Sequence, residues 1–157
     1  MGKPKFEILK HKSYLRMIRN SEGSEMFRSI FVLENGKEKD ILTNGQLSCA
    51  FYVSCLLKLF DLISRPHATV DGAIKDMINN GWKETKKMKP GDVLVWEKKT
   101  FKDGKSHGHI GFYLGDKKAI SNSARNGSLI IHQYTYGTKE GKPKRKIIKI
   151  LTHQAIK

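Results

Sequence analysis

Cys49 stands where a helix makes a thiol reactive. A turn at Asn44-Gly45 leads into an apolar stretch with helical periodicity, and the cysteine falls in its first turn, after Ser48 as a candidate N-cap. Unpaired backbone N–H groups and the positive end of the helix dipole favour the thiolate, which is the nucleophilic form of cysteine. The same placement also suits a structural cysteine, because free cysteine is among the most buried residue types. Cys49 is therefore a candidate nucleophile that needs a partner base.

His109 is the candidate base, because it opens an apolar segment with β character. An imidazole that titrates near neutrality can take a proton from a thiol and return it to a leaving amine. His107 is an alternative, since the Gly108 between the two histidines allows either ring to reach the site. His132, in a later strand, is expected to be a packed or surface histidine. The imidazole also needs a polar neighbour that fixes its tautomer and ring plane.

Three segments of the chain, in this order, resemble the NlpC-type papain-like cell-wall peptidases and their CHAP relatives. They are LSCAFYV at residues 47–53, KPGDVLVW at residues 89–96 and HIGFYLG at residues 109–115. The resemblance implies a papain-like fold and a cysteine hydrolase, a peptidase or amidase, that cleaves amide bonds in peptidoglycan. It assigns the nucleophile to Cys49 and the general base and acid to His109.

In this family the third polar group comes from the next strand, where Ser121 and Asn122 follow His109 by twelve and thirteen residues. We predict Asn122, because an amide oxygen accepts from an imidazole N–H without competing as a proton donor. Ser121 remains the alternative, and family members often have a histidine here. The family also tends to take a second oxyanion donor from a tyrosine upstream of the cysteine, and Tyr14 is the upstream tyrosine of this chain.

The elements that must position these residues fit one α+β domain over residues 1–157, with a basic and possibly mobile N-terminal segment. A hairpin is expected over residues 27–42, and helices over residues 48–63 and from a Thr69 cap to Ile78. Strands are expected at residues 91–96, 109–115, 119–123, 128–136 and 146–151. This order predicts a papain-like arrangement, with N-terminal helices packed on one face of a C-terminal antiparallel β-sheet of about five strands.

The net charge is +15, from 30 Lys and Arg against 15 Asp and Glu. Such a charge favours an anionic partner, and we expect peptidoglycan or another anionic cell-wall polymer before nucleic acid. The six histidines and two cysteines lack the spacings of common metal sites, so we expect neither a metal nor a cofactor. We expect a monomer without a membrane span or signal peptide, either cytoplasmic or released by a route that the chain does not encode.

Two other functions compete with the hydrolase. A basic nucleic-acid-binding module with a merely structural Cys49 would explain the charge, although the chain has no helix-turn-helix, RNP-type strand or finger motif. A catalytically inactive relative that binds wall fragments would keep the fold and the charge without the reaction.

Overall fold

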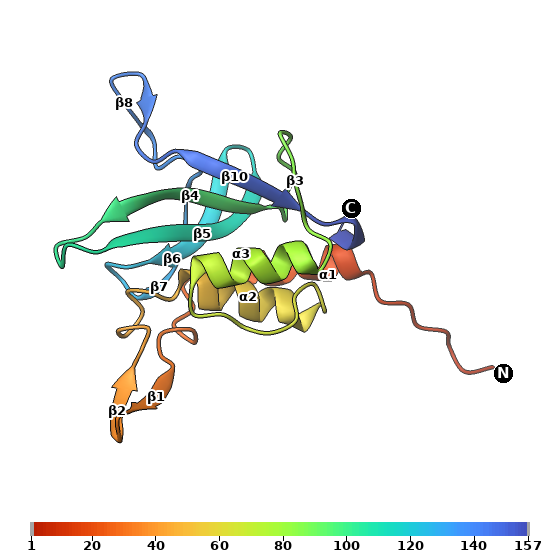
Figure 1. Cartoon of the computed structure of the whole chain (residues 1–157). Coiled ribbons are helices and arrows are strands. Elements are labelled where there is room, and N and C mark those ends of the chain that lie inside the picture. Colours follow the sequence, from red (N-terminus) through yellow and green to blue (C-terminus); the bar gives the residue numbers. More distant parts are fainter. Residues whose placement is uncertain (1, 157) are drawn as a thin grey trace.

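A twisted antiparallel sheet forms the body of the protein, and the helices lie against one of its faces (Figure 1). The computed structural model describes residues 2–156. In spatial order the strands are β3 (Lys83–Glu84), β10 (Ile147–Thr152), β4 (Val93–Thr100), β5 (Ser106–Gly115), β6 (Lys118–Ser123) and β7 (Ser128–Gln133). All neighbouring strands pair antiparallel. The predicted α+β class is confirmed, and within this sheet the sequence did not predict the short β3.

The three helices are α1 (Lys10–Asn20), α2 (Cys49–Leu59) and α3 (Val70–Asn79), followed near the C-terminus by a 3₁₀ turn, η1 (Gln154–Ile156). Helix α2 packs across β5 and β6, and α3 packs beside α2 and against β5. Helix α1 was not predicted, because its many basic residues hide a narrow buried stripe of Tyr14 and Ile18, four residues apart. Residues 2–9 precede it without helix or strand.

Two predicted helix boundaries can now be compared with the structure. Helix α3 begins as expected, because the Thr69 hydroxyl accepts from the Gly72 N–H, and it ends before Gly81 with its positive φ of 91°. Helix α2 starts at the expected place, but Ser48 makes no side-chain capping bond, and its hydroxyl points to the Arg28 carbonyl instead. The helix also ends at Leu59 rather than at residue 63, because Asp61 takes a left-handed conformation.

Alternation along the strands creates two packed faces. Ile110 and Phe112 of β5, with Ile120 of β6, point toward the helices and join the main core. On the opposite face, Leu94, Trp96 and Ala119 form a smaller buried cluster. His109 lies directly across from Trp96 and shares this second face, which separates it from the helix-facing residues of its own strand.

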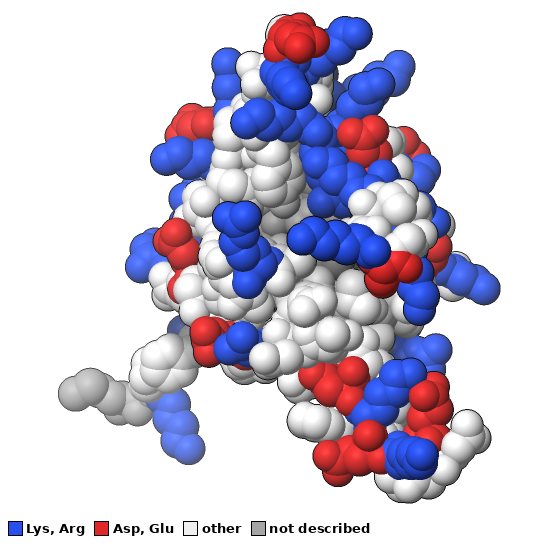
Figure 2. Space-filling model, turned by 90° about the vertical axis from the view of Figure 1, so that its left-hand side faces the viewer, with Lys and Arg blue, Asp and Glu red and all other residues white. Residues whose placement is uncertain are grey.

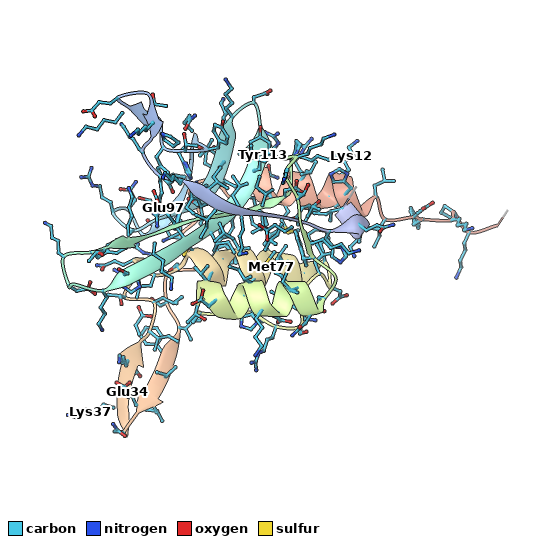
Figure 3. All side chains as sticks on the ribbon, turned by 45° about the horizontal axis from the view of Figure 1, so that its top comes forward. Lys12, Glu34, Lys37, Met77, Glu97 and Tyr113 are labelled. Atoms are coloured by element: carbon cyan, nitrogen blue, oxygen red, sulfur yellow. The ribbon has the colours of Figure 1, made fainter. Side chains whose placement is uncertain are left out.

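Two small hairpins project from this body. One consists of β1 (Phe31–Glu34) and β2 (Lys37–Asp40), within the hairpin region predicted from the sequence, and Glu34 and Lys37 mark its tip (Figure 3). The other consists of β8 (Thr138–Lys139) and β9 (Lys142–Pro143), which the sequence did not predict. It stands at the opposite side of the sheet from the first hairpin (Figure 1). The two hairpins flank the end of the molecule where α2 begins.

Within residues 2–156, no helix combines the length and the apolar character that a membrane crossing requires.

Candidate active site

A pocket of about 640 Å³ opens at the end of the molecule where α2 and α3 begin. Its walls come from the loop before α2, the start of α3, the hairpin between β4 and β5, the end of β6 and the segment that joins β7 to β10. The three residues predicted from the sequence, Cys49, His109 and Asn122, all line this pocket, together with Tyr136 and Arg145. The fold therefore brings together side chains that are nearly one hundred residues apart in the chain.

Cys49 is the first residue of α2 and is buried among the core residues of that helix. Burial raises the pKa of its thiol, and the backbone N–H groups of Ile110 and Ala50 and the charge of Arg145 oppose that rise without reversing it. The helix start therefore does not make Cys49 a thiolate by itself at neutral pH, because loss of hydration outweighs the N–H groups and the dipole. A nucleophilic role requires a base that removes the proton during the reaction.

His109 has the properties of such a base. Its ring is buried against Trp96, with ring centroids 5.2 Å apart, and burial together with the nearby charge of Arg145 lowers its pKa well below the usual value. The imidazole is therefore neutral at pH 7. Its Nε2 contacts the Ser121 Oγ at 2.9 Å and the Tyr136 hydroxyl at 2.8 Å, whereas Nδ1 makes no hydrogen bond to any residue of the described chain.

A chain of hydrogen bonds fixes which nitrogen of His109 carries the proton. The Nδ1 of His132 contacts the Gln133 carbonyl at 2.8 Å, and since a carbonyl only accepts, this nitrogen must be protonated. Burial lowers the pKa of His132, so the ring is neutral and its Nε2 accepts from the Ser121 hydroxyl at 2.8 Å. Ser121 has then given its proton away, and its oxygen accepts from His109 Nε2–H.

The hydroxyl of Tyr136 completes this network, since it also lies 3.1 Å from the Ser121 Oγ and can donate to it. With these directions three of the four contacts contain one proton, and the 2.8 Å contact between the Tyr136 hydroxyl and His109 Nε2 does not. In the opposite tautomer of His109, Tyr136 would donate to His109 Nε2, and the contacts of Ser121 Oγ with His109 Nε2 and with Tyr136 would both lack a proton. The Nε2–H tautomer therefore satisfies more of these contacts, and it leaves the lone pair on Nδ1.

Asn122 does not make the contact with His109 that we predicted. Its Nδ2 donates to the Gly45 carbonyl at 2.6 Å, and no hydrogen bond joins Asn122 to His109 among residues 2–156. The reason is strand alternation: Ser121 points to the face of the sheet that carries His109, and Asn122 points to the helix side. Ser121, the alternative named from the sequence, makes the contact, while Asn122 fastens the loop that leads into Cys49.

The other residues considered from the sequence have separate roles. His107 also lines the pocket, but its ring packs on Phe101 and its Nε2 lies 3.9 Å from an Asp103 carboxylate oxygen at the hairpin tip. Tyr14 is fully buried in the main core, and its hydroxyl donates to the Gly91 carbonyl at 2.8 Å. Tyr14 therefore does not face the pocket as an oxyanion donor.

Sequence reasoning missed Tyr136 and Arg145 and did not give His132 a part in the site. None of them belongs to a motif, and all reach the site through the strands and the hairpin that follow β6. His132 is stacked on Tyr136, with ring centroids 4.0 Å apart. His132 could have been recognised from the sequence as a polar residue within an otherwise apolar strand, β7. Nothing in the sequence distinguishes Arg145 from the basic residues beside it.

In the described part of the chain, no group of three or more His, Cys, Asp or Glu side chains is arranged to hold a metal ion. Cys49 and Cys55 are both free thiols.

Comparison with solved structures finds a similar fold in NlpC2 from Trichomonas vaginalis, with a TM-score of 0.53. The match covers 94% of this chain and 50% of NlpC2, so the chain spans half the length of that protein, and the sequence identity is 13%. At this identity the likeness concerns the fold, which is NlpC-like. No family model and no curated protein matches the chain.

Proposed function

We propose that residues 1–157 form a single papain-like hydrolase domain, and that it cleaves amide bonds in peptidoglycan as an endopeptidase or amidase. Cys49 is the nucleophile, and His109 is the general base and acid. The observation that carries this proposal is the neutral imidazole whose Nε2 is engaged by Ser121 and Tyr136 while Nδ1 is free, in the same pocket as a cysteine at a helix start. The NlpC-like fold supports the same class of reaction.

Acylation begins when His109 Nδ1 takes the thiol proton as the Cys49 sulfur attacks the amide carbon. The carbon–sulfur bond forms, and negative charge moves to the carbonyl oxygen, where backbone N–H groups at the start of α2 can stabilise it. The carbon–nitrogen bond then breaks, and the leaving amine takes the proton from His109. A thioester to Cys49 remains.

Deacylation reverses these roles. His109 takes a proton from water, and the resulting hydroxide adds to the thioester carbon. The carbon–sulfur bond breaks, the carboxylic acid product leaves, and the thiol recovers its proton. Ser121 takes part as the positioning residue that holds His109 in the Nε2–H tautomer, and we propose it in place of Asn122 as the third group.

Peptidoglycan is the proposed substrate because wall peptides carry free carboxylates and the pocket has a basic rim. Lys98 and Lys99 of β4 line the pocket, and the acidic residue of its wall is Asp71 of α3. Lys and Arg side chains are spread over this face between uncharged areas, while acidic and basic side chains gather together on the projection below it (Figure 2). Long-range attraction of an anionic polymer fits such a surface.

The test is digestion of purified cell wall by the wild type, Cys49→Ala, His109→Ala and Cys55→Ala, with mass spectrometry of the released fragments. We expect new amino and carboxyl ends with the wild type and with Cys55→Ala, and none with the other two variants. Cys55→Ala is the matched control because it removes the other thiol, which belongs to the same helix. Equal digestion by Cys49→Ala would refute the proposal, and wall binding without cleavage by the wild type would favour an inactive relative.

A further inference from the structure

Arg145 is a buried cation without a counter-ion in the described chain. The residue is 8% exposed, and no carboxylate within residues 2–156 lies close enough to form an ion pair with it. The Glu97 carboxylate acts on the guanidinium from beyond ion-pair distance, and one of its oxygens accepts from the Lys146 N–H. Burying a charge without a paired charge costs free energy, so this arrangement needs a compensating anion.

The backbone holds the guanidinium in a fixed orientation. Its Nε and Nη2 both donate to the Glu97 carbonyl, at 3.2 Å and 3.1 Å, and the Arg145 N–H donates to the Thr135 carbonyl. Glu97 lies in β4, the antiparallel neighbour of β10, and is labelled in Figure 3. A guanidinium has five N–H donors, so this anchoring leaves three of them, two on Nη1, without a partner in the described chain.

The Arg145 side chain is also part of the pocket wall. Arg145 lines it together with Cys49, His109 and Tyr136. Its charge also acts on both reacting groups, since it opposes the rise in the pKa of Cys49 and contributes to the lowered pKa of His109. A bound group that meets the guanidinium is therefore close to the thiol.

We propose that Arg145 binds a carboxylate of the substrate, so that the preferred amide is one with a free carboxylate next to the bond that is cut. This inference rests on the proposed hydrolase and names its substrate class. A carboxylate fits the planar fork of a guanidinium in two parallel hydrogen bonds, and it would supply the missing counter-ion. Arg145 is then a specificity-determining residue. A substrate without a carboxylate next to the bond that is cut would bind more weakly than one that carries it.

The test uses two alkylating reagents of similar shape, iodoacetate and iodoacetamide, of which the first carries a carboxylate. In both, the Cys49 sulfur forms a bond to the methylene carbon, and iodide leaves. The rate of Cys49 labelling is measured by mass spectrometry for the wild type and for Arg145→Gln. We expect the ratio of the iodoacetate rate to the iodoacetamide rate to fall about ten-fold or more in Arg145→Gln, as for loss of a charged hydrogen bond.

Arg16→Gln is the matched control. It makes the same change in residue type and charge at an exposed site on α1, away from the pocket. A general effect of the net charge would lower the ratio equally in both variants and would overturn the proposal. Equal loss of labelling by both reagents in Arg145→Gln would also overturn it, because Arg145 would then act on the thiolate.

A second measurement needs no variant, should Arg145→Gln fail to fold. Succinate is expected to slow labelling of wild-type Cys49 by iodoacetamide, whereas its uncharged diamide is not. Equal protection by the two compounds, or none by succinate, would contradict a carboxylate site. A selective effect of the carboxylate in a protein that does not digest cell wall would leave the site standing and refute the proposed function.

Discussion

Replacing Ser121 by alanine tests the hydrogen-bond chain behind His109. The hydroxyl lies 2.9 Å from His109 Nε2 and 2.8 Å from His132 Nε2. Its loss leaves the Tyr136 hydroxyl as the one remaining partner of His109 Nε2 in the described chain, and leaves His132 Nε2 without a donor. Leaving a buried polar group unsatisfied costs about 1–3 kcal/mol, so we expect kcat/KM for amide cleavage to fall roughly ten- to hundred-fold.

Two measurements separate this effect from general damage. The first is the rate of Cys49 alkylation by iodoacetamide, which should fall with kcat/KM. The second is ¹⁵N NMR of the His109 ring, which should show the Nε2–H tautomer in the wild type and a mixture of tautomers in Ser121→Ala. Thermal unfolding of the variant reports whether the fold persists.

Asn122→Ala is the comparison, since it belongs to the same strand but bonds the Gly45 carbonyl. We expect it to lower stability while the His109 tautomer stays unchanged. The reasoning would be refuted if Ser121→Ala kept full activity and the wild-type tautomer, or if Asn122→Ala changed the tautomer and Ser121→Ala did not.

Two further predictions follow from the pocket and its loop. Because burial raises the pKa of Cys49, labelling by iodoacetamide should keep increasing from pH 6 past pH 8.5, the usual thiol pKa, and a plateau below pH 8 would contradict this. Gly45→Ala should lower the free energy of unfolding by about 2 kcal/mol or more, because φ is 92° and a Cβ would lie 2.5 Å from Gly127 Cα. Gly36→Ala, at φ 77° with open space around it, is its control in thermal unfolding, and an equal loss in both variants would point to backbone strain alone.

Local signals in the sequence were sufficient for much of the fold. The Thr69 cap and Gly81 bound α3, and alternating apolar residues predicted the five long strands of the sheet. These signals work because capping, left-handed turns and strand periodicity depend on neighbours within a few residues. Helix α1 escaped prediction because Tyr14 and Ile18 gain their stability from distant packing, including the Tyr14 hydroxyl bond to Gly91.

The candidate site divides in the same way. The sequence alone picked out Cys49 and His109, since a helix start and an apolar strand pattern are local features, although β5 begins at Ser106, before His109. It narrowed the third group to two adjacent residues. Tertiary structure places Ser121 on the face of the sheet that carries His109, in contact with its ring, and Asn122 on the helix side.

Only the fold could bring His132, Tyr136 and Arg145 to the pocket, since each arrives from strands and hairpins later in the chain. The fold also determines the protonation states of Cys49 and His109. The sequence predicted a thiol activated by a helix, whereas burial raises the pKa of Cys49 and lowers that of His109. Residue type and spacing thus determined which groups can react, and the surrounding protein determined their charge, because hydration and hydrogen bonding are properties of the packed structure.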